Sequence, residues 1–369
     1  MTIPRDYAAQ QHRARKPSGP AATARGPHPL PAFLALALRV TGGSAERMAS
    51  VLAGVRAYQQ HPHARAVMER RVMARAGAAR LVDYGDDYGG NGGGAGQPVV
   101  LVPSLINAPD VLDLASDASL TAHLAANGLQ PLVVEWGAPG PDERGMDLDR
   151  LVVERLLPLI ATLAEPPLLV GYCLGGTIAA AAAALACPRK LALIATPWVF
   201  AGYGPERQAT MLKLWADIEP AARATGVVPI DLLQPGFWNL DPERSVAKFE
   251  RFGGLDPAAR EARHYVLVED WVNSGPPIGV AAAAHIFERL YRDDEPGRGA
   301  WAIDGVQVDP AALPCPVLNI VSATDRIVPA EAAPFAGERI DLAAGHVGMM
   351  VGGRARELLY EPLTRWLLA

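Results

Sequence analysis

LLVGYCLGGTIAAAAAA, Leu168 to Ala184, joins an apolar run to an alanine-rich run through a cysteine that is flanked by glycines. Residues 168–172 are typical of a short strand buried on both faces of a parallel sheet. Residues 174–186 predict a helix, and its small side chains allow it to pack closely on that sheet. The stretch therefore predicts a strand, a sharp turn at Cys173 and a buried helix.

The turn at Cys173 matches a nucleophile elbow, in which the reactive residue lies between a strand and a helix. Small residues are needed on either side of the nucleophile because a larger side chain would strike the neighbouring strand or helix; here they are Gly171, Gly175 and Gly176. We expect a strained backbone at Cys173 and a helix start that favours the thiolate. A buried structural cysteine is the alternative. Cys187 and Cys315 lack this context, and we expect them in the core.

An elbow predicts an acid and then a histidine later in the chain, each in a loop after a strand. Asp325 follows the apolar run VLNIVSAT, and His346 follows RIDLAAG. We expect His346 to deprotonate Cys173, and Asp325 to fix the tautomer of the imidazole and stabilise its charged form. Asp341 is a weaker candidate because it lies inside the last predicted strand.

A tetrahedral intermediate at this site would also need two backbone N–H donors. One is expected from Leu174, the residue after the nucleophile. The other is expected from the loop after the strand VVLVP, at Leu105 or Ile106.

Apolar strands alternate with helices from Pro98 onward, which predicts an α/β fold with a mostly parallel, doubly wound sheet. The interval 198–301 interrupts this alternation with helical segments, prolines and tryptophans, and we interpret it as an inserted helical cap. The full division that we expect is a disordered basic tail 1–29, a helical lead-in 30–79, an α/β core 80–197 and 302–369, and the cap 198–301.

Composition indicates an ordinary globular chain of 369 residues, with 50% hydrophobic and 20% charged residues. Residues 1–80 carry a net charge of +10 within a chain whose overall charge is −5. We interpret the basic tail as a solvated arm, and docking to an acidic partner is the alternative. Three cysteines without framework spacing favour a reduced, cytoplasmic setting. We expect no metal, no nucleic-acid partner and no transmembrane segment.

Five stretches together resemble the polyhydroxyalkanoate synthase family of α/β-hydrolase relatives, which use cysteine at the elbow. The resemblance covers residues 98–369 and is carried by VPSLINAPDVLDL from Val102, VVEWGAPGPD from Val133, GYCLGGT from Gly171, GVQVDPAALPCPVLNIVSATDRIVP from Gly305 and AAGHVG from Ala343. The family's catalytic Cys, Asp and His fall on Cys173, Asp325 and His346. Ser104 departs from the family's second proline, and the family's F-W-N-x-D is echoed by EDWVNSG, which retains Trp271 and Asn273.

The resemblance implies transfer of a 3-hydroxyacyl group from a CoA thioester to the cysteine, and then to the hydroxyl end of a growing polyester. It implies no cofactor apart from the CoA of the substrate, a location at polyester granules, and a second synthase subunit or a homodimer. A hydrolase with the same Cys-His-Asp triad, acting as a thioesterase or polyester depolymerase, is the alternative. A granule-associated or scaffolding protein without turnover is the third hypothesis, which an intact triad disfavours.

Overall fold

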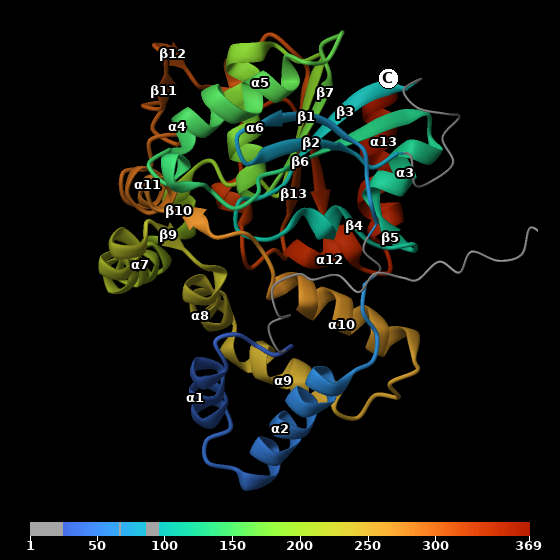
Figure 1. Cartoon of the computed structure of the whole chain (residues 1–369), viewed down its shortest axis with the longest axis vertical. Coiled ribbons are helices and arrows are strands. Elements are labelled where there is room, and N and C mark those ends of the chain that lie inside the picture. Colours follow the sequence, from blue (N-terminus) through green and yellow to red (C-terminus); the bar gives the residue numbers. More distant parts are fainter. Residues whose placement is uncertain (1–24, 66–67, 86–95) are drawn as a thin grey trace, which may run out of the picture.

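A central sheet with its covering helices occupies one end of the molecule, and a group of helices extends from it at the other end (Figure 1). The computed structural model describes residues 25–65, 68–85 and 96–369. Residues 1–24 of the expected basic tail therefore lie outside the described residues.

The main sheet has the strand order β1-β2-β6-β3-β7-β8-β13-β14. Neighbouring strands from β6 to β14 are parallel, whereas β1, β2 and β6 pair in antiparallel fashion. The bounds of the strands are β1 Val72–Ala76, β2 Ala79–Asp83, β3 Gln97–Val102, β6 Leu129–Glu135, β7 Leu168–Tyr172, β8 Lys190–Ile194, β13 Val317–Ser322 and β14 Glu338–Leu342. The predicted mostly parallel sheet is confirmed.

Helices cover both faces of the sheet. Successive side chains of the central strands point to opposite faces, so both faces carry apolar side chains that must be buried. In β3, Val100 and Val102 belong to one hydrophobic core, and Val99 and Leu101 belong to the other. The first core includes α4 Leu148–Leu151, the π-helical segment η4 Val152–Leu156, α5 Leu157–Ile160 and α6 Leu174–Ala186. The second includes α3 Leu120–Ala126, α12 His346–Val351, η9 Arg356–Tyr360 and α13 Glu361–Leu368. The fold is therefore doubly wound, as the sequence predicts.

Helices dominate the segment between β8 and β13. They are η5 Phe200–Tyr203, α7 Pro205–Thr225, α8 Ile230–Leu240, α9 Pro242–Phe252, α10 Arg260–Val272, α11 Val280–Ala284 and η6 His285–Arg292. Two short strand pairs accompany them, β9 Val227–Val228 with β10 Ile278–Gly279 and β11 Ala302–Ile303 with β12 Val306–Gln307. No described helix, in this segment or elsewhere, is both long and apolar enough to cross a membrane.

Short elements link the core strands and helices. They are η2 Pro109–Leu112, β4 Asp113–Ala115, β5 Ala118–Ser119, η3 Pro141–Glu143, η7 Pro310–Ala312 and η8 Ala330–Ala332.

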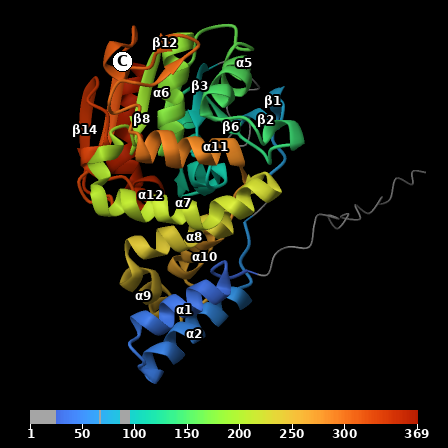
Figure 2. The same cartoon turned by 90° about the vertical axis from the view of Figure 1, so that its left-hand side faces the viewer.

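The N-terminal helices α1 Leu30–Val40 and α2 Ala45–Gln60 pack on α9 and α10, far from the sheet (Figures 1 and 2). Their contact has its own hydrophobic core, in which Phe33 meets Trp238 and Phe249 at ring-centroid distances of 5.3 and 4.9 Å. The N-terminal helices and part of the cap thus form one helical extension, although about 200 residues separate them in the sequence.

Three expectations about the N-terminal region and the cysteines are corrected by the structure. The helical lead-in ends at Gln60, and residues 72–76 form strand β1, which pairs with β2 at the edge of the sheet. The end of the predicted tail is packed on α10, because Arg25 forms an ion pair with Asp270 at 2.8 Å. Cys187 is exposed, because it follows the last residue of α6 in a left-handed conformation at the surface.

Helices α2 and α9 approach so closely at Gly54 that a Cβ there would overlap the backbone carbonyl oxygen of Phe249. We predict that Gly54→Ala lowers the free energy of unfolding by about 1–3 kcal/mol, since relief requires the two helices to move apart. Alanine is intrinsically the better helix former by about 1 kcal/mol, so overlap and propensity act in opposite directions. Urea unfolding followed by circular dichroism measures the net change in the free energy of unfolding.

Gly254→Ala is the matched control, because its Cβ would lie 3.7 Å from the Arg251 carbonyl oxygen, an ordinary contact. A Gly54→Ala protein as stable as the Gly254→Ala protein would contradict the close approach of α2 and α9.

Candidate active site

Cys173 lies between β7 and α6 with φ 55° and ψ −134°, a conformation that non-glycine residues rarely adopt. Its N–H donates to the carbonyl oxygen of Ile194 at 2.9 Å, on the neighbouring strand β8. The structure therefore has the strained strand-to-helix turn that the sequence predicts, at the carboxyl edge of the sheet.

Each glycine of the elbow lies where a Cβ would overlap another atom. At Gly171 it would overlap the Cα of Gly176, and at Gly175 the carbonyl oxygen of Val102. At Gly176 it would overlap the hydroxyl oxygen of Thr196. Two of these three contacts are with backbone atoms, so the turn can exist in this form only with glycine at those positions.

Asp325 and His346 come together from the ends of β13 and β14. The imidazole Nδ1 of His346 lies 2.7 Å from Oδ2 of Asp325, and both side chains are buried. The other carboxylate oxygen of Asp325 accepts the backbone N–H groups of Ile327 and Val328 at 2.7 and 3.0 Å. The carboxylate is thus held by its own loop and can fix the orientation of the imidazole.

Tyr172 supports His346 from the side of the sheet. The two rings stack at a centroid distance of 5.0 Å with 29° between their planes. The Tyr172 hydroxyl donates to the backbone carbonyl oxygen of His346 at 3.3 Å. Burial, together with the negative charges of Cys173 and Asp325, raises the pKa of Tyr172 well above its ordinary value, so this donor stays protonated.

The charge state of His346 reflects two opposing influences. Burial lowers its pKa, but the negative charges of Cys173 and Asp325, and hydrogen bonds to both, raise it to about 10. The imidazole is therefore held as a cation between a sulfur and a carboxylate. This arrangement brings together the three residues that chain order singled out.

The three expected oxyanion residues occupy different surroundings. Leu174 is the first residue of α6 and lines the same cavity as Cys173, and the first N–H groups of a helix have no intrahelical acceptor. Ile106 also lines this cavity, but its N–H donates to the Ser104 hydroxyl at 3.2 Å. Leu105 lines a second, smaller cavity of about 40 Å³. Leu174 is thus the best-placed donor, while the N–H of Ile106 is already occupied.

Cys173, His346 and Leu174 open onto a cavity of about 280 Å³ that is lined mainly by apolar side chains. The cap supplies much of the lining, including Met211, Leu214, Leu233, Phe237, Ile286 and Phe287. The sulfur therefore faces a largely apolar space, which suits an apolar part of a ligand.

The two expected cap residues have different roles. Trp271 lines the cavity, and its indole N–H donates to the Ala108 carbonyl oxygen at 2.8 Å. Asn273 follows the end of α10, where its side-chain oxygen accepts the backbone N–H of His28 at 3.2 Å. Asn273 therefore connects the N-terminal segment to the cap.

Sequence reasoning missed several residues of the cavity lining. The complete F-W-N-x-D pattern occurs at Phe237–Asp241 and not in the segment EDWVNSG that echoes it, and both Phe237 and Asn239 line the cavity. Tyr203 and Tyr291 line it as well. The F-W-N-x-D motif could have indicated Phe237 and Asn239. No spacing pattern in the sequence indicated the two tyrosines.

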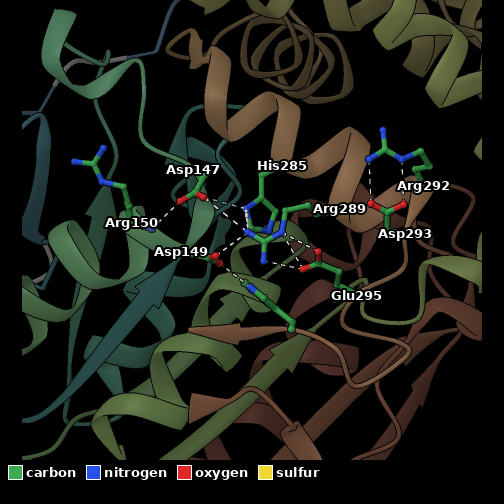
Figure 3. A network of polar contacts seen from close by, with 9 residues as sticks. Asp147, Asp149, Arg150, His285, Arg289, Arg292, Asp293 and Glu295 are labelled. Atoms are coloured by element: carbon green, nitrogen blue, oxygen red, sulfur yellow. Dashed lines mark hydrogen bonds and ion pairs between the residues drawn. The ribbon is translucent and has the colours of Figure 1, made fainter. Parts of the chain in front are cut away.

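A partly buried polar cluster joins the cap to the core beside α4 (Figure 3). Arg289 lies at its centre, 2.7 Å from Asp149, 2.7 Å from Glu295 and 3.1 Å from Nδ1 of His285. Asp147, Asp149 and His285 are close enough together to hold a metal ion. The guanidinium of Arg289 already supplies the positive charge there, and burial together with this guanidinium lowers the pKa of His285 to about 4. The cluster therefore anchors the cap to the core.

Comparison with solved structures identifies the fold as that of the α/β-hydrolases. The chain matches an esterase from Thermogutta terrifontis, solved with malate bound, with a TM-score of 0.50 and 18% identity over 82% of this chain and 98% of that one. It matches an epoxide hydrolase from Bacillus megaterium, solved in complex with an inhibitor, with a TM-score of 0.51 and 13% identity over 81% of this chain and 99% of that one. These likenesses establish the fold alone.

In sequence, the chain is similar to poly(3-hydroxyalkanoate) polymerases, in agreement with the resemblance found in its motifs. It is 29% identical to the PhaC subunit of Haloferax mediterranei over 73% of this chain and 58% of that protein. It is 25% identical to the PhaC subunits of Haloarcula marismortui and Allochromatium vinosum, over 73% of this chain in each case and 60% and 80% of those proteins. The chain thus spans less than two thirds of the Haloferax mediterranei and Haloarcula marismortui proteins. No protein-family model matches it.

The raised pKa of His346 predicts how stability depends on pH. Protonated His346 stabilises the folded chain fully below its unfolded pKa of about 6.5, and this contribution is lost as the pH rises towards about 10. We expect the free energy of unfolding to fall between pH 7 and pH 10, and to fall less in a His346→Gln variant. Urea unfolding at a series of pH values measures both slopes.

His264→Gln is the control, because burial lowers the pKa of His264 and its protonation does not change above pH 7. Parallel pH profiles for the native chain and His346→Gln would mean that His346 is not held as a cation.

Proposed function

We propose that this chain is a cysteine acyltransferase that moves a 3-hydroxyacyl group from a CoA thioester, through an acyl-cysteine at Cys173, to the hydroxyl end of a polyester. The observation that carries the proposal is the hydrogen-bonded His346–Asp325 pair next to a cysteine on a nucleophile elbow, beneath an apolar cavity. The relation to poly(3-hydroxyalkanoate) polymerases supports the choice of substrate.

In the first half of the reaction, the Cys173 thiolate attacks the carbonyl carbon of the thioester. A new carbon–sulfur bond forms and the bond to the CoA sulfur breaks, while His346 gives its proton to the departing thiolate. The N–H of Leu174 donates to the carbonyl oxygen as negative charge develops there. The acyl group is now on Cys173, and His346 is neutral.

In the second half, the terminal hydroxyl of a polyester chain attacks the acyl-cysteine. His346 takes the hydroxyl proton, an ester bond forms, and Cys173 leaves as a thiolate. Asp325 keeps the imidazole in the orientation that both proton transfers need. The thiolate and imidazolium are then restored for the next cycle.

Sulfur suits this cycle better than oxygen. Exchange of one thioester for another is close to balanced in free energy, whereas a serine ester would lie further downhill and would be a poorer acyl donor. The cavity lining keeps water away while the acyl-cysteine waits for an alcohol. No cofactor is needed apart from the CoA of the substrate. A second subunit or a homodimer, and a location in the cytoplasm at polyester granules, belong to the same proposal.

We predict that purified protein releases CoA from 3-hydroxybutyryl-CoA and that Cys173→Ala lowers this release by at least about a thousandfold, because the nucleophile is lost. High-performance liquid chromatography measures the CoA, and peptide mass spectrometry locates the acyl group. Turbidity of the sample indicates polymer, whereas free 3-hydroxybutyrate indicates a hydrolase with the same triad.

Cys187→Ala is the matched control, since this exposed thiol lies at the far end of α6. Equal CoA release by Cys173→Ala and Cys187→Ala would refute the mechanism, as would an acyl group located on any other residue.

A further inference from the structure

Two tyrosines from the cap face the cavity that contains Cys173. Tyr203 ends η5 and Tyr291 lies in η6, and their ring centroids are 5.1 Å apart. The two side chains lie close enough together for each to influence the pKa of the other. Phe200 packs against both rings, at centroid distances of 5.8 and 5.0 Å.

Packing alone does not require these hydroxyl groups. Phe200 fills the neighbouring position in the same aromatic cluster without one, and the wall around the pair is largely apolar. A polar atom in an apolar cavity is unfavourable unless it is hydrogen-bonded. Each tyrosine hydroxyl carries one proton that it can donate, and both tyrosines line the cavity. A group bound in the cavity can therefore accept a hydrogen bond from this part of the wall.

The pair lies close enough to Cys173 for a charge on its sulfur to affect the pKa of both tyrosines. Burial raises the pKa of Tyr203 well above its usual value, and the charges of Cys173 and Asp325 raise it further. Burial likewise raises the pKa of Tyr291 to about 12, with a contribution from Cys173. Both hydroxyls therefore stay protonated and remain hydrogen-bond donors.

We infer that Tyr203 and Tyr291 select the substrate by donating a hydrogen bond to the 3-oxygen of the acyl group. This inference rests on the proposed function. When the acyl group is bonded to Cys173, its 3-oxygen is attached only two carbons beyond the carbonyl carbon and so stays near the sulfur. The carbonyl oxygen belongs on the core side, at the N–H of Leu174, whereas the tyrosines approach from the cap.

A comparison of 3-hydroxybutyryl-CoA with butyryl-CoA tests this inference, because the second substrate lacks only the 3-hydroxyl. We expect the native chain to prefer the hydroxylated substrate in kcat/KM for acylation of Cys173. In the double variant Tyr203→Phe, Tyr291→Phe, the preference should fall about tenfold or more, which corresponds to the loss of one hydrogen bond. Acylation by butyryl-CoA should be little changed, since the rings and the triad remain.

Tyr265→Phe is the matched control. It removes another buried hydroxyl, which belongs to the helical extension and does not line the cavity. We expect this variant to retain the native preference, and circular dichroism of all the proteins checks that they are folded.

The outcomes separate the inference from the proposed function. Acylation of Cys173 without any preference for the 3-hydroxyl, or an equal loss with both substrates in the double variant, would overturn the role of the tyrosines and leave the acyltransferase intact. No acylation of Cys173 in the native chain would overturn both.

Discussion

The close approach of α6 to the strands around it is the constraint on which the site depends. Helix α6 begins directly after Cys173, and its first turn lies so near β3 that Gly175 has no room for a Cβ beside the carbonyl of Val102. The helix continues as a run of alanines that are fully buried against the sheet. These small residues let the helix start at the sheet edge, where its N-terminus lies beside the sulfur. A larger residue at the elbow would move the helix and with it the nucleophile.

The cap is joined to the rest of the described chain at several places, and two of them lie at its opposite ends. Arg289 joins η6 to Asp149 in the core, and the N-terminal helices hold α9 and α10 through a core of aromatic rings. Helices α7 and α8 lie between these attachments and supply several apolar residues of the cavity wall. The cavity wall is therefore formed by cap helices that are held at both ends.

The elements that were predicted correctly are those determined by a short, continuous stretch of sequence. Strand β7 and helix α6 were predicted at their observed bounds, because continuous apolar runs bounded by glycine or proline leave few alternatives. The meeting of Asp325 and His346 followed from chain order, since the carboxyl ends of parallel strands lie at one edge of the sheet. Strand β1 was missed because its partly exposed residues lack a continuous apolar run. It forms a strand through its pairing with β2, a tertiary contact that its own sequence does not indicate. The surroundings of Ile106 and the tyrosine pair depend on how loops and cap helices meet, which no periodicity encodes.

The triad alone does not decide between transfer and hydrolysis, since the same three residues can activate an alcohol or water. The decision must come from what surrounds the acyl-cysteine. An apolar wall disfavours water, but it gives a hydroxyacyl group no reason to bind in one orientation. A pair of hydroxyls on that wall changes this, because a group with a 3-oxygen would be fixed at both the sulfur and the cap. An acyl chain so fixed fills the space next to the thioester that a water molecule would need, so selection of the substrate and protection of the acyl-cysteine would have the same structural origin.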